Sequence, residues 1–171
     1  MKISMHNASV GVFSKLLQNL QVQLEKTEKW TAERKIDPNA ILLARLAPDM
    51  FHFTRQVQVM TDLAKGTVAR LAGLEPPRYE DTETTFPELK ARVAKTLAYM
   101  QSLDEKSFEG SETRAITLKL GPPGAQQEMT FEGLNYLLGF GTPNVFFHYS
   151  MVYALLRHNG MELGKRDYIG G

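Results

Sequence analysis

The stretch "TPNVFFHYSMVYALLRHNG", residues 142–160, decides the fold, because it is an apolar helix that carries the most informative polar residues of the chain. Asn144 and His148 are four residues apart, a spacing that places both side chains on one face of a helix. Arg157 falls in the last turn, where a cation suits the helix dipole, and Gly160 is a typical helix stop. Three interpretations of the polar pair stay open: the remnant of a metal site, another kind of site, and a polar plug in a core.

Apolar residues recur at steps of three and four in three earlier segments, as expected for helices that turn one face toward a core. These segments are residues 8–29, 49–72 and 86–103. Asp37 followed by Pro38 indicates the start of a short extra helix over residues 39–45. Thr85 with Glu88 three residues later forms a capping-box pattern at the start of the third long helix.

A β-hairpin is predicted at about residues 114–131, between the third and fourth long helices. The sequence RAITLKL alternates polar and apolar residues, GPPGA has the composition of a turn, and QQEMTF returns. The fourth long helix follows, with a kink or a break expected at Gly139, Gly141 and Pro143. The short tail, residues 161–171, is expected to dock on the bundle or on a partner chain.

These patterns together predict one mainly α domain over residues 1–171: a four-helix bundle with a short extra helix and a β-hairpin. Gly66 is unusual within it, because glycine inside a helix costs about 1 kcal/mol relative to alanine. A close crossing with a neighbouring helix is the expected reason for its presence.

Composition and charge narrow the possible functions. Lys and Arg number 20 against 19 Asp and Glu, and no block of basic residues could neutralise a row of phosphates, so no nucleic-acid partner is expected. The absence of cysteine excludes disulfides, thiolate metal ligands and cysteine nucleophiles. The N-terminal segment lacks the apolar core of a signal peptide, and no apolar run reaches the roughly 18 to 20 residues that span a bilayer. We therefore expect a soluble cytoplasmic protein without a membrane partner.

The common catalytic motifs are missing from the sequence. It contains neither a Gly-x-Ser-x-Gly elbow nor a His-Glu-x-x-His motif, and GFGTPN lacks the third glycine of a phosphate-binding loop. Glu80, Asp81 and Glu83 lack the ligand spacing of a calcium loop. We interpret them as a solvated acidic loop ahead of a helix.

Four stretches of the chain resemble a known family: ISMHNASVGVF, the run from ARLAPDMF to FTRQVQ, PPRYEDTETTFPELKARVAKTLAYM, and LLRHNGMELGKRDY. The resemblance covers nearly the whole chain and is to a bacterial domain-of-unknown-function family. That family is grouped with the DinB/YfiT-like four-helix bundles, many of which are presumed metalloenzymes. The resemblance thus implies the same mainly α bundle that the helical periods predict.

The resemblance also implies where a metal would sit. Typical members of the superfamily hold a divalent metal with three histidines, one from the second helix and two spaced i and i+4 on the last. His148 falls on one of the last two positions and Asn144 on the other, and the helix-two position falls near His52 or Asp49. An Asn oxygen suits hard cations and is a poor ligand for the zinc or nickel that imidazoles favour.

The main hypothesis is a degenerate metal site that binds a small molecule in a polar pocket between the second and fourth long helices. The candidate pocket residues are Asp49, His52, Gln56, Asn144, His148 and Arg157. A first alternative is an enzyme, a hydrolase or a thiol-dependent transferase, with a divalent metal held by His148, a helix-two group and waters. A second is a structural homodimer without a small-molecule site. No metal or other cofactor is assigned, enzymatic activity stays open, and a homodimer is expected.

Overall fold

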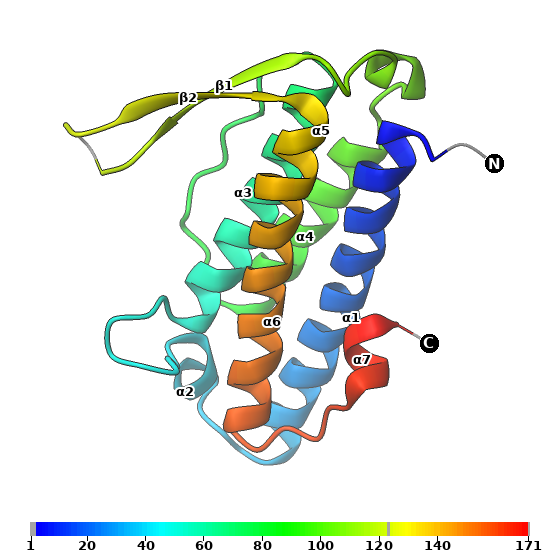
Figure 1. The fold of residues 1–171 in the computed structure, drawn as a ribbon. Coiled ribbons are helices and arrows are strands. Elements are labelled where there is room, and N and C mark those ends of the chain that lie inside the picture. Colours follow the sequence, from blue (N-terminus) through cyan, green and yellow to red (C-terminus); the bar gives the residue numbers. More distant parts are fainter. Residues whose placement is uncertain (1–2, 123, 171) are drawn as a thin grey trace.

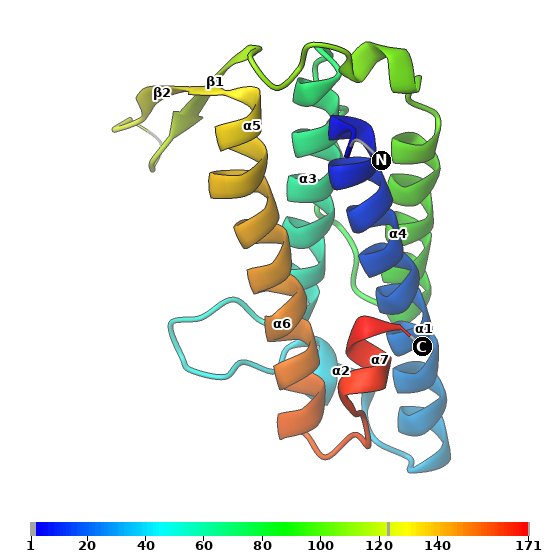
Figure 2. The same ribbon diagram turned by 45° about the vertical axis from the view of Figure 1, so that its right-hand side comes forward.

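The computed structural model describes residues 3–122 and 124–170, and in that part of the chain four long helices lie side by side (Figures 1 and 2). They are α1 (Val12–Glu33), α3 (Phe53–Leu71), α4 (Phe86–Gln101) and α6 (Thr142–His158). The shorter helices are α2 (Pro38–Leu42), α5 (Gly133–Tyr136) and α7 (Lys165–Ile169), and a 3-10 turn, η2 (Glu105–Phe108), follows α4. This mainly α architecture, with a hairpin between α4 and α6, confirms the predicted fold class. Within the described ranges, none of the helices combines the length and apolar character needed to cross a membrane.

The four long helices share one apolar core. α3 packs against both α4 and α6, and α1 packs against α4 and, less extensively, α6. Each contributes side chains with no exposed surface, such as Leu17, Met60, Val93 and Val152. Full burial of one such side chain stabilises a fold by about 1.5–3 kcal/mol. The apolar helix faces predicted from the sequence therefore stabilise the bundle.

Two predicted helix starts are confirmed by their capping bonds. The Asp37 side chain accepts a hydrogen bond of 2.9 Å from the backbone of Asn39, at the start of α2. Thr85 Oγ1 accepts from the Glu88 backbone at 3.3 Å, while the Glu88 carboxylate accepts from the Thr85 backbone at 3.0 Å. This is the reciprocal capping box that the sequence predicted for α4.

The predicted start of α3 at residue 49 is wrong by four residues. Residues 47–50 form a turn, in which the Met50 backbone donates to the Ala47 carbonyl at 3.0 Å. α3 begins at Phe53, and His52 is its N-cap. α2 likewise ends earlier than predicted, at Leu42.

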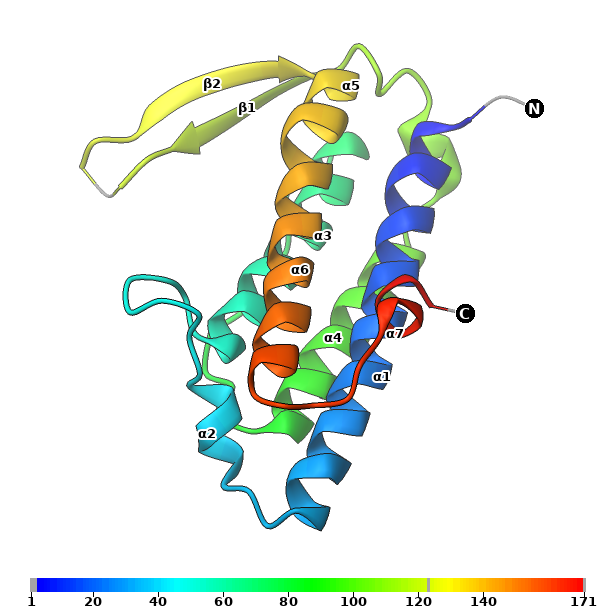
Figure 3. The same ribbon diagram turned by 60° about the horizontal axis from the view of Figure 1, so that its bottom comes forward.

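The hairpin projects sideways from one end of the bundle (Figures 1 and 3). β1 (Ala115–Leu120) pairs antiparallel with β2 (Gln127–Glu132), so that the ends of the predicted 114–131 segment match closely. Ile116 and Leu118 lie on the same face of β1 and are buried against the bundle. They hold the hairpin onto the ends of the helices.

The expected kink or break in the last long helix is wrong. α5, a π-helical stretch η3 (Leu137–Gly141) and α6 follow one another as one uninterrupted helical ribbon (Figure 2). Pro143 stands at the start of α6, directly after η3. Because proline has no N–H to donate, the wider π-helical turn before it accommodates the missing bond without ending the helix.

The close helix crossing lies at Gly141, not at Gly66. A Cβ on Gly141 would lie 2.6 Å from Cγ2 and 2.7 Å from Oγ1 of Thr67, on the neighbouring helix α3. At Gly66 the nearest atom would be Nη1 of Arg70, at 2.7 Å, which belongs to the next turn of the same helix. Gly141 therefore lets α6 approach α3, whereas Gly66 makes room for a guanidinium.

The C-terminal tail docks on the bundle through α7. The Tyr149 hydroxyl donates to the Tyr168 carbonyl at 2.8 Å, and Nε2 of Gln23 lies 2.8 Å from both the Tyr149 hydroxyl and the Asp167 carbonyl. Lys26 pairs with the Asp167 carboxylate at 2.5 Å. Burial raises the pKa of the Tyr149 hydroxyl, so it stays a donor at neutral pH.

The two glycines of η3 provide a matched stability test. We expect Gly141→Ala to lower the free energy of unfolding by about 1–3 kcal/mol, because its Cβ would overlap Thr67. Gly139→Ala should raise it by about 0.5–1 kcal/mol, since no atom lies within 4 Å and alanine favours the helix. Urea unfolding measures both, and Thr67→Ala in the Gly141→Ala background should recover part of the loss. Equal effects of the two alanines would contradict the close crossing.

Candidate functional site

The centre of the candidate site is a hydrogen bond between α3 and α6. Nδ1 of His148 lies 2.7 Å from Oε1 of Gln56, and both side chains are buried. The Gln56 amide is oriented by its own Nε2, which donates to the Phe51 carbonyl at 3.2 Å. The structure therefore brings together two of the six residues that the sequence singled out.

This bond determines the protonation state of the imidazole. An amide oxygen only accepts hydrogen bonds, so Nδ1 of His148 carries a proton, and in the neutral imidazole Nε2 carries the lone pair. Nε2 forms no hydrogen bond with residues 3–122 and 124–170, yet it is not among their fully enclosed unpaired polar atoms, so solvent reaches it. His148 thus presents a neutral acceptor nitrogen to a solute.

Aromatic rings and one cation surround the imidazole. Phe51 lies nearly parallel to it, with ring centroids 6.5 Å apart, and Phe147 meets it edge-on at 5.1 Å. The Arg55 guanidinium lies over the Phe51 ring, 5.8 Å from its centroid. Burial lowers the pKa of His148 below its ordinary value of 6.5, and the Arg55 charge lowers it further. Both effects favour the neutral form.

Asn144 lies one helical turn before His148, and its side chain is partly buried. Nδ2 donates to the carbonyl of Phe140 at 2.8 Å, within the same continuous helix. Asn144 does not cap the start of a helix, because the helix continues through it. Its side-chain oxygen is left without a hydrogen bond from the described residues and can accept one from a ligand.

His52 has a structural role at the start of α3. Its Nδ1 accepts a hydrogen bond of 3.3 Å from the Arg55 backbone, which caps the helix. Partial burial lowers the pKa of His52, and the Arg45 charge lowers it further, so the ring stays neutral and keeps its acceptor nitrogen. His52 therefore lies beside the site without joining the Gln56–His148 pair.

Two predicted pocket residues lie outside the site. Asp49 is exposed in the turn before α3, because the helix begins four residues later than the period suggested. Arg157 is exposed at the end of α6, where Nη1 donates to the Met161 carbonyl at 2.5 Å. It closes the end of the helix, as a cation in the last turn is expected to do.

The residues at this position do not fit the divalent metal that the superfamily implies. Asn144 stands where the superfamily has a second histidine, and its amide is turned to the Phe140 carbonyl. No group of three His, Cys, Asp or Glu side chains with metal-binding geometry occurs within residues 3–122 and 124–170. Nε2 of His148 is free, with Nδ1 held by Gln56 as in many metal-ligating histidines, but one imidazole does not supply the number of ligands that such metals require.

A cleft lies under the hairpin, between α3 and the α5–η3 stretch of the helix that continues into α6. This α3–α6 cleft has a volume of about 610 Å³, and residues of β1 also line it. Its lining includes Arg55, Val59, Arg70, Leu118, Tyr136 and Phe140. Gln56, Asn144 and His148 are not among its lining residues, but Arg55 links the two places, because its guanidinium lies over the Phe51 ring beside His148.

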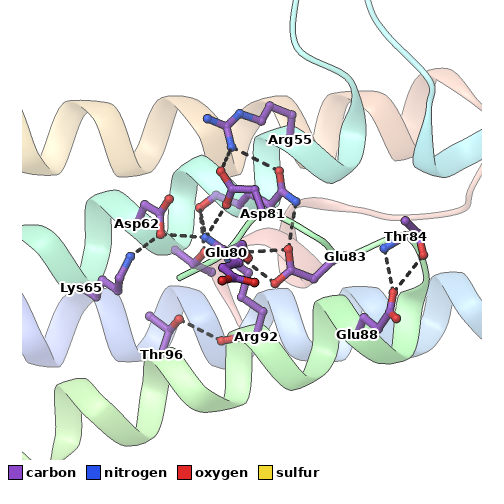
Figure 4. A network of polar contacts seen from close by, with 12 residues as sticks. Arg55, Asp62, Lys65, Glu80, Asp81, Glu83, Thr84, Glu88, Arg92 and Thr96 are labelled. Atoms are coloured by element: carbon purple, nitrogen blue, oxygen red, sulfur yellow. Dashed lines mark hydrogen bonds and ion pairs between the residues drawn. The ribbon is translucent and has the colours of Figure 1, made fainter. Parts of the chain in front are cut away.

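A second polar cluster lies on the other side of α3, around Arg92 of α4 (Figure 4). The Arg92 side chain is 2% exposed, and its guanidinium contacts Asp62 at 2.7 Å, Asp81 at 3.0 Å and Glu83 at 3.0 Å. Its Nε donates to the Thr61 hydroxyl at 2.7 Å. These bonds satisfy the guanidinium and fasten the loop before α4 across α3.

The interpretation of residues 80–83 as a solvated acidic loop is therefore wrong for two of them. The Asp81 and Glu83 carboxylates pair with Arg92, and Asp81 also pairs with Arg55. The helical period of the apolar residues could have indicated this cluster, because Arg92 stands on the apolar face of α4, next to Val93. A charged residue on a buried helix face requires partners, and only acidic residues brought near by the fold can supply them.

Comparison with solved structures defines the class of protein. The chain matches a crystal structure described as a DinB family member protein from Shewanella denitrificans, with a TM-score of 0.85 and 36% sequence identity. The match covers 98% of this chain and 92% of that chain. Together with the bundle and its inserted hairpin, it defines a DinB-like helical protein, and the resemblance read from the sequence is confirmed.

The family follows from the chain itself. Residues 5–169 match the family model described as a domain of unknown function, DUF1993. The protein therefore belongs to the DUF1993 family. None of the curated proteins matches the chain.

The lowered pKa of His148 predicts a stability change with pH. Between pH 6.5 and the lower pKa of the folded state, the unfolded chain binds a proton that the folded chain does not, so stability falls as the pH falls through this window. We expect His148→Gln to flatten this decline. Urea unfolding at a series of pH values measures it, with His158→Gln as the control for an exposed imidazole on α6. Parallel curves for wild type and His148→Gln would contradict the burial of a neutral imidazole.

The Arg92 cluster predicts a large loss on truncation of its centre. Arg92→Gln should lower the free energy of unfolding by about 3–5 kcal/mol, because it leaves three carboxylates without their shared cation. Arg55→Gln removes one partly exposed ion pair with Asp81 and should cost at most about 1 kcal/mol. The comparison is made by urea unfolding at neutral pH. A loss below 1 kcal/mol for Arg92→Gln would show that the cluster does not hold the loop.

Proposed function

We propose that this DUF1993 protein binds a small organic molecule between α3 and α6, at a position where DinB-like relatives are thought to hold a metal. The observation that carries the proposal is the 2.7 Å bond between Gln56 and His148, which leaves Nε2 of a neutral imidazole as an open acceptor. A metal site would use that imidazole as a ligand. Here a neutral amide partner prepares it for a hydrogen bond to a ligand.

The surroundings of His148 support an organic ligand with a hydroxyl or amine donor. Nε2 of His148 and the side-chain oxygen of Asn144 are both acceptors, one helical turn apart on the same helix. Phe51 and Phe147 supply apolar ring surface beside them, and both are about half exposed. A donor group with an attached apolar or aromatic body satisfies both sets of contacts.

The adjoining cleft supports a ligand of ordinary metabolite size. Its volume of about 610 Å³ lies within the range of about 300–1,000 Å³ typical of small-molecule sites. Its walls mix apolar side chains with a few charged ones, as such sites commonly do. The cleft and the Gln56–His148 pair together support binding, and neither requires a chemical step.

The two alternative functions have less support. A metal-dependent hydrolase or transferase requires at least three protein ligands, and the described residues provide no such group near His148. The homodimer stays a prediction, and sedimentation velocity over a range of concentrations tests it. A monomer at all concentrations would remove the purely structural function, whereas ligand binding would be unaffected.

Phenol and anisole test the proposed function, because they share a ring and differ in the hydrogen-bond donor. We expect phenol to shift the Nε2 resonance of His148 and to bind about three- to tenfold more tightly than anisole, the effect of one neutral hydrogen bond. His148→Gln should remove this difference. Two-dimensional NMR of ¹⁵N-labelled protein measures both, and His158→Gln is the matched control. Equal binding of the two probes, or a phenol affinity unchanged in His148→Gln, would refute the proposal.

Zinc provides the complementary measurement. Calorimetric titration of wild type and His148→Ala should give no stoichiometric binding that depends on His148, because the second superfamily position is Asn144 and no group of three metal-binding side chains lies within the described residues. A one-to-one site lost in His148→Ala would contradict the neutral site and favour the metal-dependent alternative.

A further inference from the structure

Arg70 is a cation without a carboxylate partner at the hairpin end of the α3–α6 cleft. Its guanidinium donates to the Tyr136 hydroxyl at 3.4 Å, and no ion pair joins it to any residue within 3–122 and 124–170. The other two cations on α3, Arg55 and Lys65, both have acidic partners, as does Arg92 on α4. A half-buried guanidinium with one neutral partner has unused donors.

Gly66 provides the space in which this guanidinium lies. A Cβ at residue 66 would lie 2.7 Å from Nη1 of Arg70, a distance that such contacts do not reach. Gly66 is buried, and glycine at this helical position costs about 1 kcal/mol relative to alanine. The glycine thus allows Arg70 to fold back along α3, with its donors at the Tyr136 hydroxyl.

The other charged residues of the cleft do not neutralise Arg70. Arg55 is paired with Asp81, and Asp62 is paired with Lys65. Lys119 lies 3.7 Å from Glu128. Glu75 is the remaining acidic residue of the lining, is exposed, and forms no ion pair with the described chain. It therefore competes with an incoming anion from the rim and does not fill the site.

The wall beside Arg70 is apolar and aromatic. Tyr136 and Phe140 stack with ring centroids 5.7 Å apart, and Leu118 of β1 adds an aliphatic surface. Gly66 lies ten residues after Gln56, which corresponds to about 15 Å along the helix axis. The cleft therefore places the cationic Arg70 beside an apolar and aromatic wall.

We propose that the ligand of this cleft is an organic oxyanion, a carboxylate or a phosphate, whose charged group binds Arg70 and whose apolar body lies under β1. The inference rests on the proposed function, because both place a small molecule between α3 and α6. It adds the chemical class of the ligand. Carboxylate and phosphate oxygens accept the paired N–H groups that a free guanidinium offers.

The test compares 4-phenylbutyrate and phenyl phosphate with the uncharged 4-phenylbutanol, titrated into the full chain and followed by NMR. We expect both anions to shift the amide signals of Tyr136 and Phe140 and to bind about tenfold more tightly than the alcohol, the effect of a charge-assisted bond. Arg70→Gln should remove that preference. Lys29→Gln carries the same change of charge on α1, and is the control that leaves it intact.

Two further variants separate an anion site from a structural arginine. Gly66→Ala should raise the midpoint of urea unfolding and yet weaken both anions about tenfold, because its Cβ displaces the guanidinium. Glu75→Gln should strengthen binding of both anions by removing the competing carboxylate.

The possible outcomes have distinct meanings. A preference for one anion over the other identifies carboxylate or phosphate as the group bound. Equal binding of anions and alcohol at the cleft, or anion affinities unchanged in Arg70→Gln and Gly66→Ala, overturns the anion site while phenol binding at His148 still supports the proposed function. Shifts confined to other parts of the protein overturn the anion site as well.

Discussion

The close approach of α6 to α3 at Gly141 is the constraint on which the candidate site depends. With only a hydrogen at this position, the last helix can lie against Thr67, and the two helices then run together past Asn144 to His148. Gln56 and His148 belong to segments 92 residues apart in the sequence, and this packing brings their polar atoms to 2.7 Å. The α3–α6 cleft lies between α3 and the α5–η3 stretch that leads into α6, so the same helix packing positions both the pair and the cleft.

Most of the fold could be predicted from the sequence, because helical periods and caps are local signals. The capping box at Thr85 and the alternation in the hairpin each depend on a few neighbouring residues, and both were confirmed. The wrong predictions concern helix boundaries, which hydrophobic periodicity does not determine. A turn at residues 47–50 occupies the predicted start of α3, and a π-helical stretch carries the helix on to Pro143 without ending it.

The candidate site was less predictable, since its chemistry depends on which side chains meet across helices. Spacing placed Asn144 and His148 on one helical face, and the family resemblance directed attention to His52 and Asp49. Neither could show that Asp49 lies in a turn or that Arg157 closes a helix end. The Arg92 cluster and the unpaired Arg70 were missed for the same reason. A charge on a buried helix face indicates that it has partners, but only the three-dimensional structure shows whether those partners are present.

The contrast between these two arginines bears on what the protein does. Arg92 is enclosed, and its carboxylate partners and carbonyl contacts leave its donors satisfied, so its role is to hold the loop before α4. Arg70 is half-buried in an open cleft and has one neutral partner, although Glu75 lines the same cleft. Desolvating a guanidinium without pairing it lowers the stability of the fold. The glycine that makes room for it lowers the stability further. Such a cost supports a role in binding something outside the chain. Arg70 and Nε2 of His148 both keep hydrogen-bonding capacity that the described part of the chain does not use.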